Sequence, residues 1–430
     1  MEKRLSVMDT LSVGFMTFAF FLGAGNMIFP PMAGFLAGDN YLPAMIGFLC
    51  TAVGLPLLGL IAVAKAGGSI PVITQKLPSW VGLAIACAIF IIIGPAFAAP
   101  RAGLVAYEMG AVPFLDGANA TTQALYSVIF FGLAMVLALF PGKLVDSVGK
   151  ILTPALIVLF AILAIAAFLF PQDPIVAAQG AYGTEPFTKG FLEGYGTMDA
   201  LASLVFGMLI VDLLRKKGVT ESGQQARYLS IAAIIAAAGL CFVYVPLFYL
   251  GATSSELGMG ADTGGVILTT FVQQVFGSFG VVMLGAVVTL ACITTVIGLL
   301  SACSEYFGEL VPQVGYRGFV VINAVFCAVV ANVGLSQLIA ISIPVLMMVY
   351  PIAMALIAFC FARSYMKNER VGLILMVAVS TLFGLIDGVS AAGVNTSQLN
   401  FLPLYDVGMA WLLPTIIATF IALFIKADNS

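Results

Sequence analysis

The sequence contains no histidine and few charged residues, and these two absences exclude several classes of function. Only 9% of the 430 residues are charged and 62% are hydrophobic. An average soluble domain carries roughly 25% charged residues. So few charges cannot cover a folded surface of this size in water, which indicates that lipid surrounds the protein. We therefore expect an all-α integral membrane protein. Without histidine the chain lacks the usual metal ligand and the commonest general base, which argues against metalloenzymes and Ser-His or Cys-His hydrolases.

Cysteine spacing and charge balance exclude further classes. The seven cysteines lie in apolar runs without Cys-x-x-Cys spacing, so we interpret them as small buried hydrophobic residues rather than as disulfides or zinc ligands. The formal charge is -3 and there is no basic domain, which argues against a nucleic-acid partner. No Ser-rich, Pro-rich or charged run separates two regions. We therefore expect one transmembrane domain over 1–430, in contact with lipid and with no obligate protein partner evident.

Apolar runs of about 20 residues, the length that crosses a bilayer as a helix, occur along the whole chain. We predict twelve spans, at about 11–35, 41–64, 80–108, 122–140, 147–170, 191–213, 228–250, 277–304, 318–333, 338–362, 371–389 and 407–425. The first run is too long for a signal peptide, so we expect it to remain in the protein. A cytoplasmic N-terminus places every basic residue except Arg101 and Lys189 on the cytoplasmic side, as the positive-inside rule requires. Both termini are then cytoplasmic. Trp80 and Trp411 lie near predicted helix ends, as interfacial anchors do.

Two predicted helices, half a chain apart, contain residues that interrupt a helix. The first span carries Gly23, Gly25 and Asn26, followed by Pro30 and Pro31. The sixth begins with glycines and polar residues over 194–200. A kink or a close packing contact is the simpler interpretation. Spans one to five end near 170 and spans six to ten near 362, so the chain divides into two five-helix blocks.

Because each block has an odd number of spans, the second block starts on the opposite side of the membrane and is inverted relative to the first. We therefore predict a 5+5 inverted repeat over about 11–170 and 191–362, with discontinuous helices 1 and 6 and two extra helices over about 371–425. Interrupted helices at corresponding positions of inverted halves indicate a transporter's binding site. Unwound backbone near Ala24 and Gly25 offers N–H groups to a carboxylate, and the Ala19 and Leu22 carbonyls suit a cation.

The segment from Phe21 to Pro31, followed by Gly34 and Gly38, resembles the first-helix signature of the bacterial branched-chain amino acid:cation symporters, the BrnQ type. The resemblance extends to the twelve-span length and to the segment 194–200. It implies uptake of leucine, isoleucine and valine across the inner membrane on the inverted-repeat fold of leucine-transporter-type proteins. The coupling ion would be sodium or a proton, with no other cofactor.

In that wider fold a sodium site lies between the first-helix break and a small-x-x-hydroxyl-hydroxyl pattern in the eighth helix. The matching oxygen ligands in this sequence belong to Ala19, Leu22, Ala291, Thr294 and Thr295. Oxygen ligands suit a hard cation. The alternative is that both threonine hydroxyls only bond back to the preceding helical turn.

We expect substrate contacts at both breaks, with an apolar cavity for the side chain near Leu201 and Phe206. The predicted substrate residues are Gly23, Ala24, Gly25, Asn26, Tyr195, Gly196, Thr197, Asp199 and Leu201. For Asn26 the alternatives are a helix cap or a second ion ligand. For Asp199 they are an N-cap, contact with the substrate ammonium group, or proton coupling.

Arg101 lies 21 residues after Trp80, about 30 Å along a helix, which predicts a position near the outer face. There it is either a solvated interface residue or part of an outer gate with Glu108, Asp387 or Asp406. Glu305 and Glu309 are expected to face water at the cytoplasmic end of the eighth span.

Three other functions remain open at this point. A cation-coupled transporter of another small neutral amino acid fits the same features. A channel would need a continuous polar pore, and paired interrupted helices favour alternating access instead. A membrane-embedded enzyme would need a nucleophile with a base or a metal cluster, which the sequence does not offer.

Overall fold

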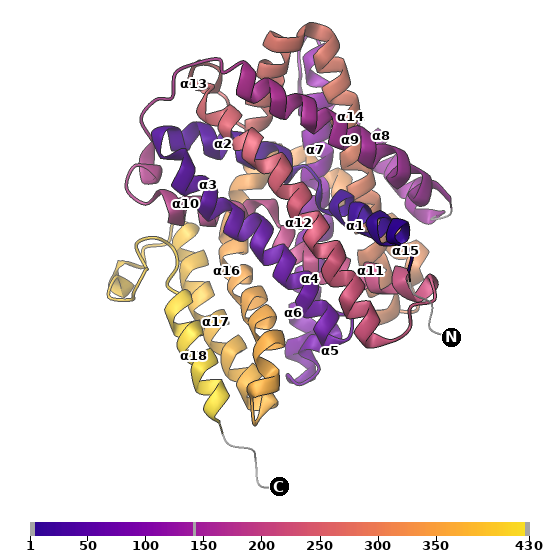
Figure 1. Cartoon of the computed structure of the whole chain (residues 1–430), viewed down its shortest axis with the longest axis vertical. Coiled ribbons are helices and arrows are strands. Elements are labelled where there is room, and N and C mark those ends of the chain that lie inside the picture. The colour runs from indigo at the N-terminus through magenta and orange to yellow at the C-terminus, as the bar shows by residue number, and fades with distance from the viewer. Residues whose placement is uncertain (1–4, 141–142, 426–430) are drawn as a thin grey trace.

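The computed structural model describes residues 5–140 and 143–425, and the side chains of 143–152 lie outside this description. Of the basic residues used for the orientation, Lys3, Arg4 and Lys426 lie outside the described residues, as do the side chains of Lys143 and Lys150. Within the described part every regular element is helical, and the helices form one elongated bundle (Figure 1). The predicted all-α class is confirmed.

Helices follow each of the predicted spans. The principal ones are α1 (Val7–Phe21), α2 (Gly25–Ala37), α3 (Tyr41–Leu49), α4 (Leu55–Ala66), α6 (Ser79–Ile91), α7 (Ala98–Gly110), α8 (Ala120–Leu139), α9 (Lys143–Leu169), α10 (Pro186–Glu193), α11 (Asp199–Lys216), α12 (Ser222–Ala252), α14 (Gly264–Leu310), α15 (Gly315–Val330), α16 (Leu335–Ala362), α17 (Glu369–Ala391) and α18 (Leu412–Phe424). Short helices α5 (Ile70–Thr74) and α13 (Ser255–Gly258) lie between them. Within the described residues, eight helices are long and apolar enough to cross a bilayer, or nine with one bent pair, beside three shorter apolar helices. This is consistent with twelve spans without establishing that count.

Apolar side chains on the outside of the bundle explain why these helices need lipid. Leu125, Val128 and Ile129 of α8 are each more than 60% exposed. A stripe of this kind in water would drive aggregation, whereas a hydrocarbon phase solvates it.

The first and sixth predicted spans are both broken. The first consists of α1 and α2, separated at Leu22–Ala24. The sixth consists of 186–197 and α11, which meet at a bend of 41°. Both breaks lie where the glycine and polar residues predict them.

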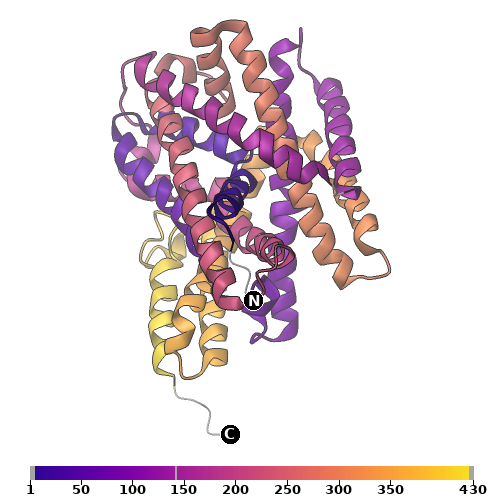
Figure 2. The same ribbon diagram turned by 45° about the vertical axis from the view of Figure 1, so that its right-hand side comes forward.

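Each broken span packs against a helix of the other repeat, as an inverted repeat requires. The first span lies along α12 and the sixth along α3 and α4, and both pairings can be followed in Figures 1 and 2. Between α2 and α12 the backbones touch, because a Cβ added to Gly34 would lie 1.9 Å from the Phe248 carbonyl oxygen. One added to Gly251 would lie 1.9 Å from the Pro31 oxygen. Small residues allow such close helix packing in membranes.

The same kind of contact joins α3 and α10, where a Cβ on Gly47 or Gly190 would lie 2.0 Å from a backbone oxygen of the other helix. The other half of each broken span, α1 or α11, meets side chains of its neighbour instead of backbone. Gly14 of α1 faces the side chain of Ile235, and Gly207 of α11 faces that of Val63.

The last two helices, α17 and α18, lie beside α16 on one edge of the bundle (Figure 1). They are the two extra helices that the sequence predicts beyond the repeats. Asp387 of α17 fixes the start of α18, because its carboxylate accepts hydrogen bonds from the Ala410 and Trp411 N–H groups at 3.2 Å.

Two further irregularities are not predicted from the sequence. Between α6 and α7 the chain forms a π-helical turn, Ile92–Ala96, and Gly94 has non-helical backbone angles. Helix α14 bends at Gly277, whose φ of 65° favours glycine, so a helical arm over 264–276 precedes the predicted eighth span.

Candidate functional site

The break in the first span leaves backbone groups that a side chain of α2 partly satisfies. The Gly23 N–H donates to Asn26 Oδ1 at 2.9 Å. Ala24 precedes α2 as its N-cap and offers no side-chain hydrogen bond. Asn26 therefore binds a backbone N–H inside the break, although it occupies the second position of the helix rather than the cap. The first backbone N–H groups of α2 therefore need hydrogen-bond acceptors from other groups.

The break in the sixth span turns at Met198, a non-glycine residue with φ of 63°. Thr197 Oγ1 donates to the Gly194 carbonyl at 3.0 Å and accepts from the Asp199 N–H at 3.4 Å. Asp199 is the first residue of α11 and Met198 is its N-cap, so an N-cap role for Asp199 is wrong. Its side chain points to the other broken helix instead.

A hydrogen-bonded group joins the two breaks. Asp199 Oδ2 accepts from Asn26 Nδ2 at 2.9 Å and from the Tyr244 hydroxyl of α12 at 2.6 Å. Asn26 Nδ2 also donates to the Tyr244 hydroxyl. All three side chains are buried. Hydrogen bonds to a buried carboxylate compensate its lost hydration and fix its orientation, so this group holds the two breaks together.

Arg101 also lies at the breaks, and its predicted position near the outer face is wrong. It is only 3% exposed, and its Nη1 donates to the Gly196 carbonyl at 2.5 Å. The prediction took Trp80 as the inner membrane boundary. The π-helical turn Ile92–Ala96 interrupts the helix between Trp80 and Arg101, and Arg101 lies at the level of the two breaks.

The proposed partners of Arg101 bind elsewhere. Asp387 accepts from the start of α18, and Glu108 accepts from the Thr263 hydroxyl at 3.2 Å. Within the described residues the hydrogen bonds of Arg101 go to Gly196 and Thr197 and not to Asp406. Glu305 and Glu309 are exposed, as expected.

The two tryptophans differ from each other. Trp80 is 73% exposed, as an interfacial anchor would be. Trp411 lies at a helix end as predicted, directly before α18, but it is 3% exposed, so the prediction that it is an interfacial anchor is wrong.

A small cavity lies between the two breaks. Its polar and backbone lining includes Gly23, Ala24, Gly25, Asn26, Arg101, Thr197, Met198, Asp199 and Thr295. Its apolar lining includes Phe20, Phe21, Ile93, Ala98, Ala102, Ala202, Phe206 and Leu299. The cavity thus combines one cationic and one anionic side chain with an apolar wall.

Three predicted substrate residues do not line this cavity. Tyr195 stacks on Tyr350 with ring centroids 4.1 Å apart. Leu201 is fully buried in the core. Gly196 contributes its carbonyl to Arg101. The other six line the cavity, as does Phe206.

The predicted cation ligands are brought together only in part. Thr295 Oγ1 lies 3.4 Å from the Leu22 carbonyl oxygen and 3.0 Å from that of Ala291. Thr294 bonds back to Leu290 and Ala291 in its own helix. In the part of the chain that the structure describes, the contacts of Thr295 reach the Leu22 and Ala291 carbonyls and not that of Ala19. Of the two threonines, Thr295 is therefore the one that reaches the break.

Sequence reasoning missed Arg101 and Tyr244. The available signal was a lone arginine inside a long apolar run, since ionisable residues in membrane-spanning segments indicate a functional site. Tyr244 gives no comparable signal, because tyrosine is common in apolar helices.

A fold of inverted repeats whose discontinuous helices meet at a mixed polar and apolar cavity defines a membrane transport protein. The model of the family described as "Branched-chain amino acid transport protein" matches residues 6–429, so the chain belongs to this family and is not an enzyme.

Its relatives are similar over nearly their whole length. The chain is 46% identical to the branched-chain amino acid transport system 2 carrier protein of Pseudomonas aeruginosa, over 97% of this chain and 96% of that one. It is 44% identical to the permease BraB of Bacillus subtilis, over 98% and 96% of the two chains. It is 41% identical to the permease BrnQ of Escherichia coli, over 98% and 97%. The resemblance seen in the first helix is confirmed.

Solved structures show the same fold at low identity. The inward-facing conformation of Mhp1 superposes with a TM-score of 0.64 at 14% identity, covering 96% of this chain and 90% of that one. A closed conformation of Mhp1, described as a nucleobase-cation-symport-1 family transporter, gives a TM-score of 0.58 at 16% identity, covering 96% and 91%. The predicted leucine-transporter-type fold is confirmed.

Proposed function

We propose that this chain imports leucine, isoleucine and valine across the bacterial inner membrane by alternating access, coupled to sodium. The names of its relatives support the substrate class. The apolar wall of the cavity, with Phe206 and Ile93, suits a branched aliphatic side chain. Both termini face the cytoplasm in this proposal, following the distribution of basic residues.

The observation that carries sodium coupling is the position of Thr295. Its hydroxyl on α14 meets the Leu22 carbonyl at the end of α1, on the wall of the same cavity. Hydroxyl and carbonyl oxygens are the ligands that a hard cation prefers, and a neutral set can hold sodium without a carboxylate. A cation between Leu22, Ala291 and Thr295 would then link α1 to α14 while the substrate is bound.

Proton coupling is the second candidate, because Asp199 is a carboxyl group that faces the cavity. The two mechanisms predict different driving forces. A sodium site needs an inward sodium gradient, whereas a carrier based on Asp199 needs an inward proton gradient.

The test is uptake of radiolabelled leucine into proteoliposomes, with sodium and proton gradients imposed separately. Valine and isoleucine serve as expected competitors and alanine as the control competitor. Uptake driven by inward sodium and blocked by the branched competitors is the expected result. Uptake driven only by a proton gradient would favour proton coupling through Asp199 over sodium coupling. Uptake blocked equally by alanine would widen the substrate class to small neutral amino acids, and no uptake under either gradient would contradict symport.

A further inference from the structure

Arg101 occupies the point where the two broken helices face each other. Its Nη1 and Nη2 donate to the Gly196 and Thr197 carbonyls, at 2.5 Å and 3.4 Å, at the end of 186–197. A cation is favourable at this end of a helix because the free carbonyls carry partial negative charge. On the other side, a Cβ on Gly25 would lie 2.8 Å from Nη2, so the guanidinium is in contact with the start of α2.

One of the three guanidinium nitrogens makes no hydrogen bond within the described residues. Arg101 Nε has no hydrogen-bond partner among the described residues, although the side chain is 3% exposed. A buried N–H without an acceptor is costly, and more so when it carries charge. Arg101 is part of the cavity lining, so a carboxylate that enters the cavity meets the guanidinium, and one that reaches Nε supplies the missing acceptor.

The neighbouring helix terminus favours an anion at the same place. Helix α2 starts here without a side-chain cap, so its first N–H groups and the positive end of its dipole face the break. Placing an arginine beside this end brings two positive features together, which is unfavourable unless an anion lies between them. A carboxylate matches both, because a guanidinium binds its two oxygens in a planar, paired geometry.

The carbonyls at the sixth-span break already accept hydrogen bonds, so a substrate ammonium group needs another acceptor. Gly196 and Thr197 accept from Arg101. Asp199 is the anionic group that remains on the cavity wall. Both hydrogen bonds to its side chain end on Oδ2, from Asn26 and Tyr244. These donors hold the carboxylate in place beside the cavity.

We propose that Arg101 binds the carboxylate of the amino-acid substrate while Asp199 binds its ammonium group. This inference rests on the proposed function and adds the residue that selects for a free carboxylate. One cation and one anion on the wall match the two charges of a zwitterion, so the loaded cavity gains no net charge. Arg101 thereby makes the site specific for free amino acids against their amides and esters.

The experiment compares binding of three ligands to purified full-length protein by competition with radiolabelled leucine. Leucine carries both charges, leucinamide lacks the carboxylate and 4-methylpentanoate lacks the ammonium group. We expect the unmodified protein to prefer leucine over leucinamide by about 100-fold or more, since a site built to bind a group rejects a ligand without it. In Arg101→Gln this preference falls to about 10-fold or less, whereas the preference over 4-methylpentanoate is retained. Asp199→Asn gives the opposite pattern.

A structural role for Arg101 predicts another result. If Arg101 only pins the carbonyls of the break, Arg101→Gln weakens leucine and leucinamide equally, and an unchanged preference overturns the proposal. Arg363→Gln is the matched control, because Arg363 also donates to a backbone carbonyl, that of Lys65 at 2.5 Å, but lies outside the cavity. This variant keeps the full preference for leucine.

Two further outcomes distinguish a failure of the proposed function from a failure of the role of Arg101. If the unmodified protein binds no leucine, the proposed function fails whatever the variants do. If Arg101→Gln does not fold, an experimental structure of the unmodified protein with leucine decides. A carboxylate oxygen within about 3 Å of the Arg101 guanidinium supports the proposal, and a carboxylate placed elsewhere overturns it.

Discussion

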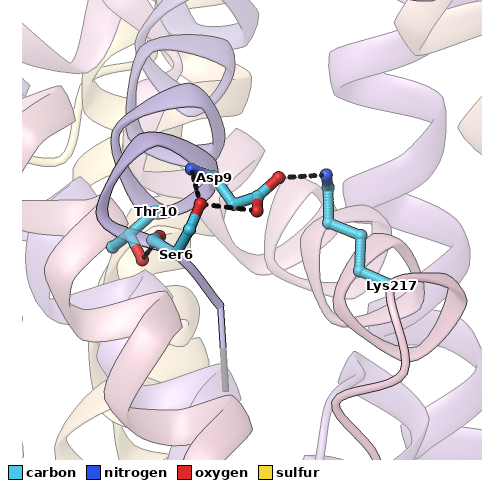
Figure 3. A network of polar contacts seen from close by, with 4 residues as sticks. All are labelled: Ser6, Asp9, Thr10 and Lys217. Carbon is cyan, nitrogen blue, oxygen red and sulfur yellow. Dashed lines mark hydrogen bonds and ion pairs between the residues drawn. The ribbon is translucent and has the colours of Figure 1, made fainter. Parts of the chain in front are cut away.

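Asp9, in the first turn of α1, forms an ion pair with Lys217, the residue that follows α11, with 3.0 Å between Oδ1 and Nζ (Figure 3). Ser6 caps α1 and donates to the other oxygen of Asp9 at 2.7 Å. The pair therefore connects the ends of α1 and α11 that lie away from the cavity.

Breaking this pair is expected to favour separation of α1 from α11. Both side chains are partly exposed, at 44% for Asp9 and 34% for Lys217, so water screens the pair and its effect on stability is small. Asp9→Asn should increase hydrogen exchange of backbone amides in the first turns of α1 by a factor of about 1.5 to 5. The control is the exchanged pair, Asp9→Lys with Lys217→Asp, which should restore slow exchange. Unchanged exchange in both variants would show that the pair does not hold α1.

Gly25→Ala is expected to weaken leucine binding by about tenfold or more without unfolding the protein. The added Cβ would lie 2.8 Å from Arg101 Nη2 and 3.1 Å from the Thr197 Cα, so Arg101 must move. Gly132→Ala in α8 is the matched control, because its Cβ would meet no atom within 4 Å. Equilibrium binding of radiolabelled leucine measures both variants. Normal affinity in Gly25→Ala would show that substrate does not use this approach.

Thr295→Ala and Thr294→Ala separate a cation ligand from a hydroxyl that bonds only within its helix. We expect Thr295→Ala to raise the sodium concentration for half-maximal leucine uptake by about tenfold, the cost of one lost ligand of about 1.4 kcal/mol. Thr294→Ala should change it little, because its hydroxyl bonds to Leu290 and Ala291. Sodium titration of uptake in proteoliposomes gives the measurement. Equal effects of the two substitutions would contradict the assignment of Thr295 alone.

Tyr244→Phe removes one donor to Asp199 while the ring keeps its edge contact with Phe48, at 5.3 Å between centroids. Leaving a buried carboxylate with one hydrogen bond fewer costs about 1–3 kcal/mol, so thermal unfolding in detergent should begin at a lower temperature. Tyr249→Phe, the same change in the same helix, provides the control, because the hydroxyl that donates to Asp199 is that of Tyr244. A Tyr244→Phe variant as stable as the control would argue against the hydrogen-bonded group as a link between the breaks.

Asp387→Ala should lower stability without changing leucine affinity. Its carboxylate accepts from two N–H groups at the start of α18, and loss of a cap costs about 0.5–2 kcal/mol. Asp199→Ala, in contrast, should lower leucine affinity. Loss of affinity in Asp387→Ala would extend the site toward α17 and α18.

The breaks could be predicted from the sequence because glycines beside polar residues are costly in a helix surrounded by lipid. Gly23, Gly25 and Asn26 signal the first break, and Gly194 to Asp199 the second. The similar lengths of the two blocks and the odd number of spans in each give the inverted repeat. These features are local sequence patterns or segment lengths, and neither depends on how the helices pack.

Arg101 could not be placed because its depth depends on where the helix enters the membrane. The estimate assumed one regular helix from Trp80 to Arg101, but the chain between them is interrupted near Gly94. Tyr244 joins the site only because α12 packs along the broken helix, a tertiary contact that no local pattern encodes. The same limit applies to Thr294 and Thr295, since only the rotation of α14 decides which hydroxyl faces the break.

The glycine contacts of α2 and α10 give the two sides of the bundle different stiffness. Where backbone touches backbone, as at Gly34 and Gly47, no side-chain rotation can absorb a shift, so α2 must travel with α12 and α10 with α3. Where a glycine meets a side chain, as Gly14 meets Ile235 and Gly207 meets Val63, a change of rotamer can absorb it. Opening on the side of α1 and α11 can therefore begin with single helices, whereas opening on the other side has to move pairs.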